Sequence, residues 1–141
     1  MGRELGLMRH YPRTRNRLLH RPSISSEDRL IARRFDKDYF DGDRKHGYGG
    51  FHYEPRFWTS VVADFAEHYK LSATASILDV GCAKGFMLRD FRRLLPHAAL
   101  AGVDISEYAV SQADPEISAH LVVGNAAHLP FPDNSMHLVA S

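Results

Sequence analysis

The chain has 141 residues, of which 44% are hydrophobic and 25% charged, and its formal net charge is +1. This length suffices for one domain with one hydrophobic core, and the near-neutral charge gives no overall attraction to nucleic acid or to an anionic membrane. The single cysteine excludes an internal disulfide, and the sequence has neither a membrane-spanning apolar run of about 20 residues nor the apolar core of a secretory signal, so we expect a cytoplasmic protein.

The first segment, residues 1–22, is strongly basic. It contains six arginines and a single acidic residue, Glu4. Such a composition is typical of a solvated segment without a fixed structure. We therefore predict a basic, flexible tail; the alternatives are an arm that contacts RNA and a transit peptide.

Residues 23–75 form the second predicted segment, which should contain two helices. Ser25, followed by Asp28 three positions later, is typical of a capped helix start. Pro55 suits the first turn of a second helix, whose apolar residues recur every three to four positions. We expect this second helix to pack on a sheet.

Between these helices, residues 36–53 combine glycine, aromatic and charged residues without a helical or strand period, which predicts a loop. The centre of the loop either covers a binding site as a lid or packs on the following helix. The residues of this possible lid are Tyr48, Gly49, Gly50 and Phe51. His46 and His52 lie in the same loop but lack a third ligand, so we expect no metal site.

The stretch from residue 76 to residue 88 has the pattern of a strand, a turn of small residues and the start of a helix. Its small residues allow a ligand to approach the backbone closely. A carboxylate at Asp79 would repel a pyrophosphate and attract an ammonium group. The turn also lacks the last glycine of a dinucleotide-binding fingerprint, because Phe86 occupies that position.

The motif Asp79-Val-Gly81-Cys-Ala83-Lys-Gly85 resembles the D-x-G-x-G-x-G motif of class I S-adenosylmethionine-dependent methyltransferases, with an alanine in place of the middle glycine. The resemblance implies a Rossmann-like fold, S-adenosyl-L-methionine as cofactor and methyl transfer as the reaction. Cys82 is expected to act as a small loop residue and not as a nucleophile, because the sequence places no base beside it.

Two later segments support the resemblance. Residues 98–104 form an apolar run that ends in Asp104, about 20 residues past the turn, where a carboxylate that binds ribose is expected. Residues 121–126 form a third strand that ends in a polar residue and a small one, Asn125 and Ala126. In the resembled family this pair meets the adenine.

Residues 129–141 resemble the loop that leads into the fourth strand of the family, although His137 stands where an aspartate is common. Together these segments imply a binding site for S-adenosyl-L-methionine. Its expected residues are Asp79, Gly81, Cys82, Ala83, Gly85, Asp104, Ile105, Asn125 and Ala126. No catalytic residue can be named from the sequence.

The alternation of strands and helices after residue 76 predicts consecutive right-handed β-α-β units. The first strand should be central, with the second and third on one side of it and the fourth on the other. The resemblance implies an α/β, Rossmann-like methyltransferase fold, a mostly parallel sheet with flanking helices, here incomplete with about four of seven strands. We therefore expect a basic tail (1–22), N-terminal helices with a lid segment (23–75), and the first half of an S-adenosylmethionine-binding domain (76–141), truncated after the fourth strand.

The function implied by the resemblance is S-adenosylmethionine-dependent methyl transfer to an unidentified acceptor, with this chain a fragment of the enzyme. We expect a small molecule as acceptor and neither nucleic acid nor a membrane as partner. Two alternatives remain: a non-catalytic cofactor-binding or interaction module, and an NAD-dependent oxidoreductase on the same architecture.

Overall fold

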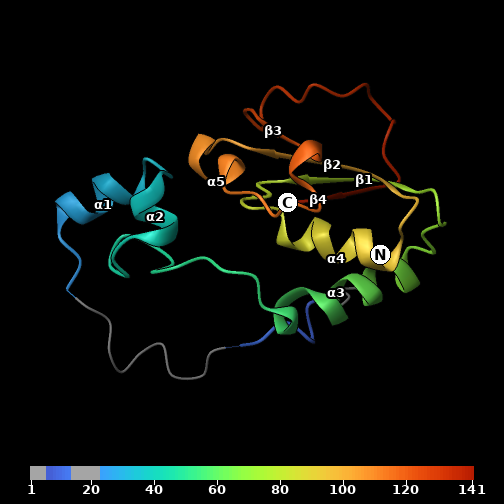
Figure 1. The fold of residues 1–141 in the computed structure, drawn as a ribbon, viewed down its shortest axis with the longest axis horizontal. Helices are drawn as coiled ribbons and strands as arrows, with labels where there is room; N and C mark the ends of the chain where they lie inside the picture. Colours follow the sequence, from blue (N-terminus) through green and yellow to red (C-terminus); the bar gives the residue numbers. More distant parts are fainter. Residues whose placement is uncertain (1–5, 14–22) are drawn as a thin grey trace, which may run out of the picture.

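The centre of the molecule is a four-stranded parallel sheet with the strand order β3-β2-β1-β4 (Figure 1). The computed structural model describes residues 6–13 and 23–141. Within them the strands are β1 (Ser76–Val80), β2 (Ala99–Asp104), β3 (Leu121–Val123) and β4 (Leu138–Ala140). The helices are α1 (Ser26–Ala32), α2 (Lys37–Asp41), α3 (Pro55–His68), α4 (Phe86–Leu94) and α5 (Glu107–Ser111), with a short 3-10 helix, η1 (Ser118–His120), before β3.

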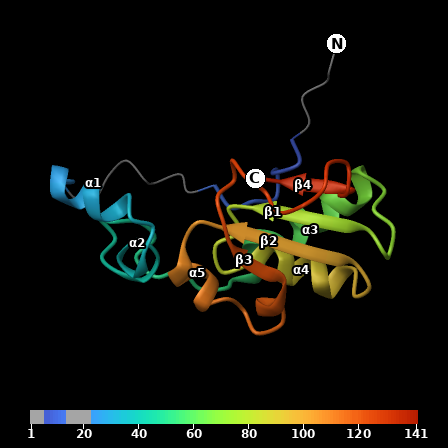
Figure 2. The same cartoon turned by 90° about the horizontal axis from the view of Figure 1, so that it is seen from above.

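The strand order confirms the prediction made from the β-α-β units. β1 is central and pairs in parallel with β2 over five residues, from Ser76 opposite Ala99 to Val80 opposite Val103. β4 pairs with the other edge of β1, and β3 pairs with the outer edge of β2. The carboxyl ends of all four strands therefore lie at one end of the sheet, and α1 and α2 lie beyond that end (Figure 2).

The hydrophobic core lies between one face of the sheet and the helices α3 and α4, which lie together on that face (Figure 1). Leu88 and Phe91 of α4 are fully buried and belong to one cluster with Ile77 of β1 and Leu100 of β2. Val62 of α3 is also buried in this cluster. The predicted helical period of residues 55–69 therefore does place its apolar side in the core, as expected for an amphipathic helix on a sheet.

The start of α1 has the predicted capping arrangement. The Ser25 hydroxyl accepts a hydrogen bond from the Asp28 backbone N–H at 3.0 Å, and the Asp28 carboxylate accepts one from the Ser25 backbone N–H at 2.9 Å. These bonds satisfy two of the backbone donors that a helix start leaves free. Asp28 also accepts a hydrogen bond from His46 at 3.0 Å, so this histidine connects the loop after α2 to α1.

Residues 36–53 are not a continuous loop, and that prediction was wrong for their first part. α2 forms at Lys37–Asp41, with Asp36 as its N-cap. Phe40 in this short helix is 3% exposed. Five residues have little helical stability of their own, so tertiary contacts of the buried aromatic side chain select the helix where the sequence period does not indicate one.

Part of the predicted flexible tail also has a defined place. Residues 6–13 lie against α3, where the ring of Tyr11 contacts those of Phe57 and Trp58 at centroid distances of 5.3 and 5.2 Å. Arg9 donates two hydrogen bonds to Asp64. Contact between aromatic rings therefore outweighs the solvation expected from the charge of this segment. The rest of the predicted tail lies outside the described residues.

His137, which stands where the resembled family often has an aspartate, joins the amino ends of β1 and β4. Its Nδ1 accepts a hydrogen bond from the Ser76 backbone N–H at 3.1 Å, and its own backbone N–H donates to the Ser76 carbonyl at 2.9 Å. His137 therefore lies at the end of the sheet opposite to the predicted site and contributes to strand pairing.

None of the helices described for residues 6–13 and 23–141 combines the length and the apolar character that crossing a bilayer requires.

Candidate functional site

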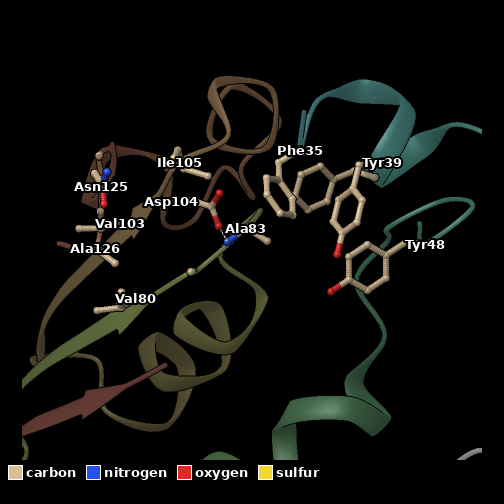
Figure 3. A pocket seen from close by; sticks show the side chains of 13 residues that line it. Phe35, Tyr39, Tyr48, Val80, Ala83, Val103, Asp104, Ile105, Asn125 and Ala126 are labelled. Carbon is tan, nitrogen blue, oxygen red and sulfur yellow. Dashed lines mark hydrogen bonds between the residues drawn. The ribbon is translucent and has the colours of Figure 1, made fainter. Parts of the chain in front are cut away.

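A cavity of about 330 Å³ opens at the carboxyl ends of the strands, between the sheet and the segment that contains α2. Two groups of residues line it from opposite sides (Figure 3). The group at the strand ends, here called the strand-end half, consists of Val80, Gly81, Ala83, Val103, Asp104, Ile105, Gly124, Asn125 and Ala126. The group from the N-terminal segment, here called the cap half, consists of Phe35, Tyr39, Phe40 and Tyr48.

Asp104 holds the strand-end half together. It ends β2, it is 8% exposed, and its two carboxylate oxygens accept hydrogen bonds from different backbone N–H groups. One oxygen accepts from Ala83 at 2.7 Å and the other from Ser106 at 2.8 Å. An ionised carboxylate has about four acceptor positions. Asp104 can therefore fix the turn after β1, fix the start of α5 and still accept hydrogen bonds from a ligand.

The turn after β1 has few free backbone donors. The N–H groups of Gly81 and Cys82 donate to the Val103 carbonyl, that of Ala83 donates to Asp104, and that of Gly85 donates to the Cys82 carbonyl. Gly81 and Ala83 make this curled path possible with φ values of 81° and 50°. A phosphate-binding loop needs its N–H groups directed at the ligand. This turn instead directs most of them into the protein.

Two of the predicted site residues, Cys82 and Gly85, face the protein interior and do not line the cavity. Cys82 is 6% exposed and belongs to the hydrophobic core. Burial raises the pKa of its thiol, and the nearby carboxylates of Asp79 and Asp104 raise it further, so it is a poor nucleophile. A Cβ atom at Gly85 would lie 2.9 Å from Leu121, so this glycine allows α4 to pack closely on the neighbouring segment.

Asp79 also lies at the carboxyl end of β1 but is not part of the cavity lining, in contrast to its neighbours Val80 and Gly81. Side chains alternate along a strand, so Asp79 shares a face with Ile77, which packs in the core. The carboxylate is 8% exposed and accepts no hydrogen bond within the described part of the chain. Burial raises its pKa to about 7, and the charge of Asp104 contributes to this shift. Its predicted contact with an ammonium group stays a prediction.

The adenine positions predicted from the third strand do lie in the cavity. Asn125, Ala126 and also Ile105 are lining residues, and Figure 3 shows Asn125 and Ala126 on the far side of Asp104 from the cap half. The Asn125 side-chain oxygen accepts a hydrogen bond from the Ala127 backbone N–H at 2.9 Å. The amide oxygen has a second lone pair and the amide nitrogen two further donors, so Asn125 can still bind a ligand.

The predicted lid divides into two parts. Tyr48 lines the cavity, whereas Gly49, Gly50 and Phe51 do not. The two glycines have φ values of 68° and 109° and form the turn that returns the chain. Phe51 stacks on Phe86 of α4 with ring centroids 5.0 Å apart. Phe51 therefore packs on α4, whereas the second interpretation expected packing on the following helix, α3. The lid role of Tyr48 stays a prediction.

The other cap residues were missed by the sequence analysis. Tyr39 and Phe40 belong to α2, which was predicted to be a loop, and Phe35 follows α1 with a φ of 49°, which is rare for an aromatic residue. The ring of Phe35 is nonetheless 41% exposed and faces the cavity. The signal in the sequence was a series of aromatic residues without a helical or strand period. It indicated that these side chains are in contact with other groups, but not that they line a cavity.

The electrostatics of the cavity are simple. Among the described residues that line it, Asp104 is the only one with a formal charge, and no basic side chain is present. Asp79 lies close enough for Asp104 to raise its pKa. The site therefore favours a ligand that carries positive charge near the turn after β1 and disfavours a polyanion.

Comparison with known proteins finds similarity in the part of the chain that forms the sheet. Residues 77–141 match the family model described as a methyltransferase domain. Over 124 residues the chain is 28% identical to demethylmenaquinone methyltransferase of Symbiobacterium thermophilum, an alignment that covers 81% of this chain and 47% of the relative. The chain thus spans about half the length of this curated relative.

Two solved structures are similar to part of this chain. The crystal structure of the MccD protein is 29% identical with a TM-score of 0.49, and covers 55% of this chain and 37% of its own. The structure of the YcgJ protein from Bacillus subtilis is 24% identical with a TM-score of 0.47, and covers 55% of this chain and 35% of its own. The match of the family model shows that residues 77–141 are similar to a methyltransferase domain, which supports the resemblance to class I methyltransferases for this part of the chain.

Proposed function

We propose that this chain contributes the cofactor-binding half of an S-adenosylmethionine-dependent methyltransferase. The observation that carries the proposal is the position of Asp104. Its carboxylate is fixed by the N–H groups of Ala83 and Ser106 in a cavity that also contains Asn125 and Ala126. Three successive strand ends thus contribute to one small-molecule site at the carboxyl edge of a parallel sheet, where such folds bind their ligands.

The chemistry of the cavity fits the cofactor better than it fits a dinucleotide. The N–H groups that would bind a pyrophosphate are already used by Val103, Asp104 and Cys82. The carboxylate of Asp104 gives this end of the cavity a negative potential, to which Asp79 adds charge above its pKa of about 7. S-adenosylmethionine carries an ammonium group and a sulfonium group, and when bound it supplies an electrophilic methyl group.

We assign the following roles to the residues of the strand-end half. Asp104 accepts hydrogen bonds from the two hydroxyl groups of the ribose at its remaining acceptor positions. Asn125 and the backbone of Ala126 bind the adenine, while Gly81 and Ala83 allow the methionine part to approach the turn. Asp79 contributes negative charge beneath the turn.

The protein's contribution to methyl transfer is proposed to be positioning and exclusion of water. A bound methyl donor and an acceptor held in line react far faster than the same groups in solution. The aromatic rings of Phe35, Tyr39 and Tyr48 cover the side of the cavity opposite Asp104. We propose a small acceptor with an apolar or aromatic body, because the cap half offers aromatic surface and no basic group. The activity of the Symbiobacterium relative on demethylmenaquinone is compatible with this class.

Isothermal titration calorimetry tests the proposed cofactor directly. The chain should bind S-adenosylmethionine and its demethylated product, S-adenosylhomocysteine, and should not bind NAD or ATP. Asn125→Ala should weaken S-adenosylmethionine binding by about 1 kcal/mol through the lost hydrogen bond, whereas Gln112→Ala, which removes an exposed amide outside the cavity, should have no effect. Binding of NAD without binding of S-adenosylmethionine would contradict the proposal and favour an oxidoreductase.

A further inference from the structure

One residue of the turn after β1 belongs to neither half of the cavity and connects the two. Lys84 lies between Ala83 and Gly85, yet its side chain extends away from the strand ends and is 8% exposed. Its Nζ contacts the Asp41 carboxylate at 2.6 Å and donates to the Phe51 carbonyl at 2.9 Å. Lysines are rarely buried unless they are paired, so the burial of Lys84 depends on these two partners.

Asp41, at the end of α2, is the common acceptor of this connection. Besides Lys84 it accepts hydrogen bonds from the Phe51 backbone N–H at 2.9 Å and from the Tyr108 hydroxyl of α5 at 2.7 Å. Burial opposes ionisation of this carboxyl, but the hydrogen bonds and the charge of Lys84 outweigh it and lower the pKa of Asp41 to about 2. Asp41 and Lys84 therefore form a largely buried ion pair at neutral pH.

The ion pair lies directly beside the aromatic residues of the cap half. Tyr39 and Phe40 precede Asp41 in α2, and Tyr48 is fixed to them because its backbone N–H donates to the Tyr39 carbonyl at 2.9 Å. A displacement of Asp41 relative to the turn would therefore move three of the four aromatic side chains that line the cavity. Conversely, a ligand that shifts the turn would move Lys84 and with it the cap half.

We propose that Lys84 and Asp41 are positioning residues: their ion pair fixes the cap half against the strand-end half and so sets the affinity for the methionine end of the cofactor. This inference rests on the proposed function. The effect concerns the methionine end because Asn125 and Ala126, the proposed adenine contacts, lie beyond Asp104 on the side away from the cap half (Figure 3). The coupling is reciprocal, so a bound cofactor also stabilises the ion pair.

Two ligands distinguish positioning from general structural support. S-adenosylmethionine contains both the adenosyl part and the amino-acid part, whereas 5′-methylthioadenosine lacks the amino-acid part. Calorimetry on Lys84→Met and Asp41→Asn should show affinity for S-adenosylmethionine reduced roughly tenfold or more, with affinity for 5′-methylthioadenosine reduced less than about threefold. Tyr108→Phe removes one hydrogen bond to Asp41 but keeps the ion pair, and should give a smaller loss in the same direction.

The control is Arg93→Met, which removes a positive charge and an ion pair with Glu116 from the exposed side of α4. It should leave both affinities unchanged. Equal losses for the two ligands in the Lys84, Asp41 and Tyr108 variants would show a structural role only and overturn the inference, as would unchanged affinities. Failure of the unaltered chain to bind S-adenosylmethionine would remove the proposed function itself, and this result is visible before any variant is compared.

Discussion

The two halves of the cavity are built by different means. In the strand-end half the decisive hydrogen bonds come from the backbone, and two backbone N–H groups donate to the carboxylate of Asp104. In the cap half the polar connections to the sheet come from side chains, above all Lys84, Asp41 and Tyr108, with stacked aromatic rings between them. The strand-end half is fixed by hydrogen bonds of the sheet backbone and has one geometry. The cap half is attached through side chains, so it can be displaced at a moderate cost in free energy. We therefore expect the strand-end half to determine which cofactor binds and the cap half to respond to it.

The largest effect should come from Asp104→Ala. The N–H groups of Ser106, which is buried, and of Ala83, which is partly buried, would lose their acceptor. Each unsatisfied buried donor costs about 1–3 kcal/mol, so the free energy of unfolding should fall by about 2–6 kcal/mol. Urea unfolding followed by tryptophan fluorescence measures this. The exposed carboxylate of Asp133 provides the matched control, because Asp133→Ala should change the free energy by less than about 0.5 kcal/mol. Similar losses in both variants would show that the two hydrogen bonds of Asp104 do not hold the strand-end half together.

Asp79→Asn should stabilise the ligand-free protein at alkaline pH. The folded-state pKa of Asp79 is raised to about 7, so the folded chain binds more protons than the unfolded chain between pH 4 and 7 and stability falls as the pH rises through this range. The substitution removes this penalty and should add about 2–4 kcal/mol at pH 8 and almost nothing at pH 4. Thermal unfolding at both pH values tests the prediction; a gain that does not depend on pH would contradict it.

The cap half should detach first in acid. The folded-state pKa of Asp41 is lowered to about 2, so its contribution of about 2 kcal/mol is complete above the unfolded value near 4 and disappears as the pH falls through 2. Amide hydrogen exchange should show the Phe51 N–H losing protection between pH 4 and 2 while amides of β1 and β2 keep theirs. In Asp41→Asn this difference in pH dependence should vanish. Simultaneous loss of protection in both regions would indicate a single cooperative unit.

The smallest effect concerns Phe35. Its φ of 49° costs about 1–2 kcal/mol for a residue with a side chain, whereas its edge contact with Tyr39 contributes about 0.5–1.5 kcal/mol. Phe35→Gly should therefore change the free energy of unfolding by less than about 1 kcal/mol. Phe35→Ala keeps the unfavourable backbone conformation and loses the ring, so it should be less stable than Phe35→Gly. The reverse order would show that the backbone here is not strained.

The sequence predicted the position of several strand-end residues in the fold because the causes of that position are local. An apolar run that ends in Asp104, and another that ends in Asn125, place both residues at the same edge of a parallel sheet once the order of the strands is known. The pattern of apolar residues could not predict which residues at the strand ends and in the turn face the cavity. Asp79 and Cys82 lie in the predicted strand end and turn, yet their side chains are buried, and Gly85 packs closely on Leu121.

The cap half was largely unpredictable for the opposite reason. α2 and the position of Phe35 depend on contacts with residues far away in the sequence, such as the ion pair between Asp41 and Lys84, which lie 43 positions apart. No local pattern encodes such a pair. The packing of residues 6–13 on α3 is of the same kind. A strongly basic composition predicted solvent exposure, whereas the ring contacts of Tyr11 and the hydrogen bonds of Arg9 to Asp64 place the segment on the helix.

The curled turn after β1 has a consequence for competition between ligands. Because the N–H groups of Gly81, Cys82, Ala83 and Gly85 already have acceptors, a free triphosphate finds little to bind there, however concentrated it is. We therefore expect added ATP to compete only weakly with a ligand bound against this turn.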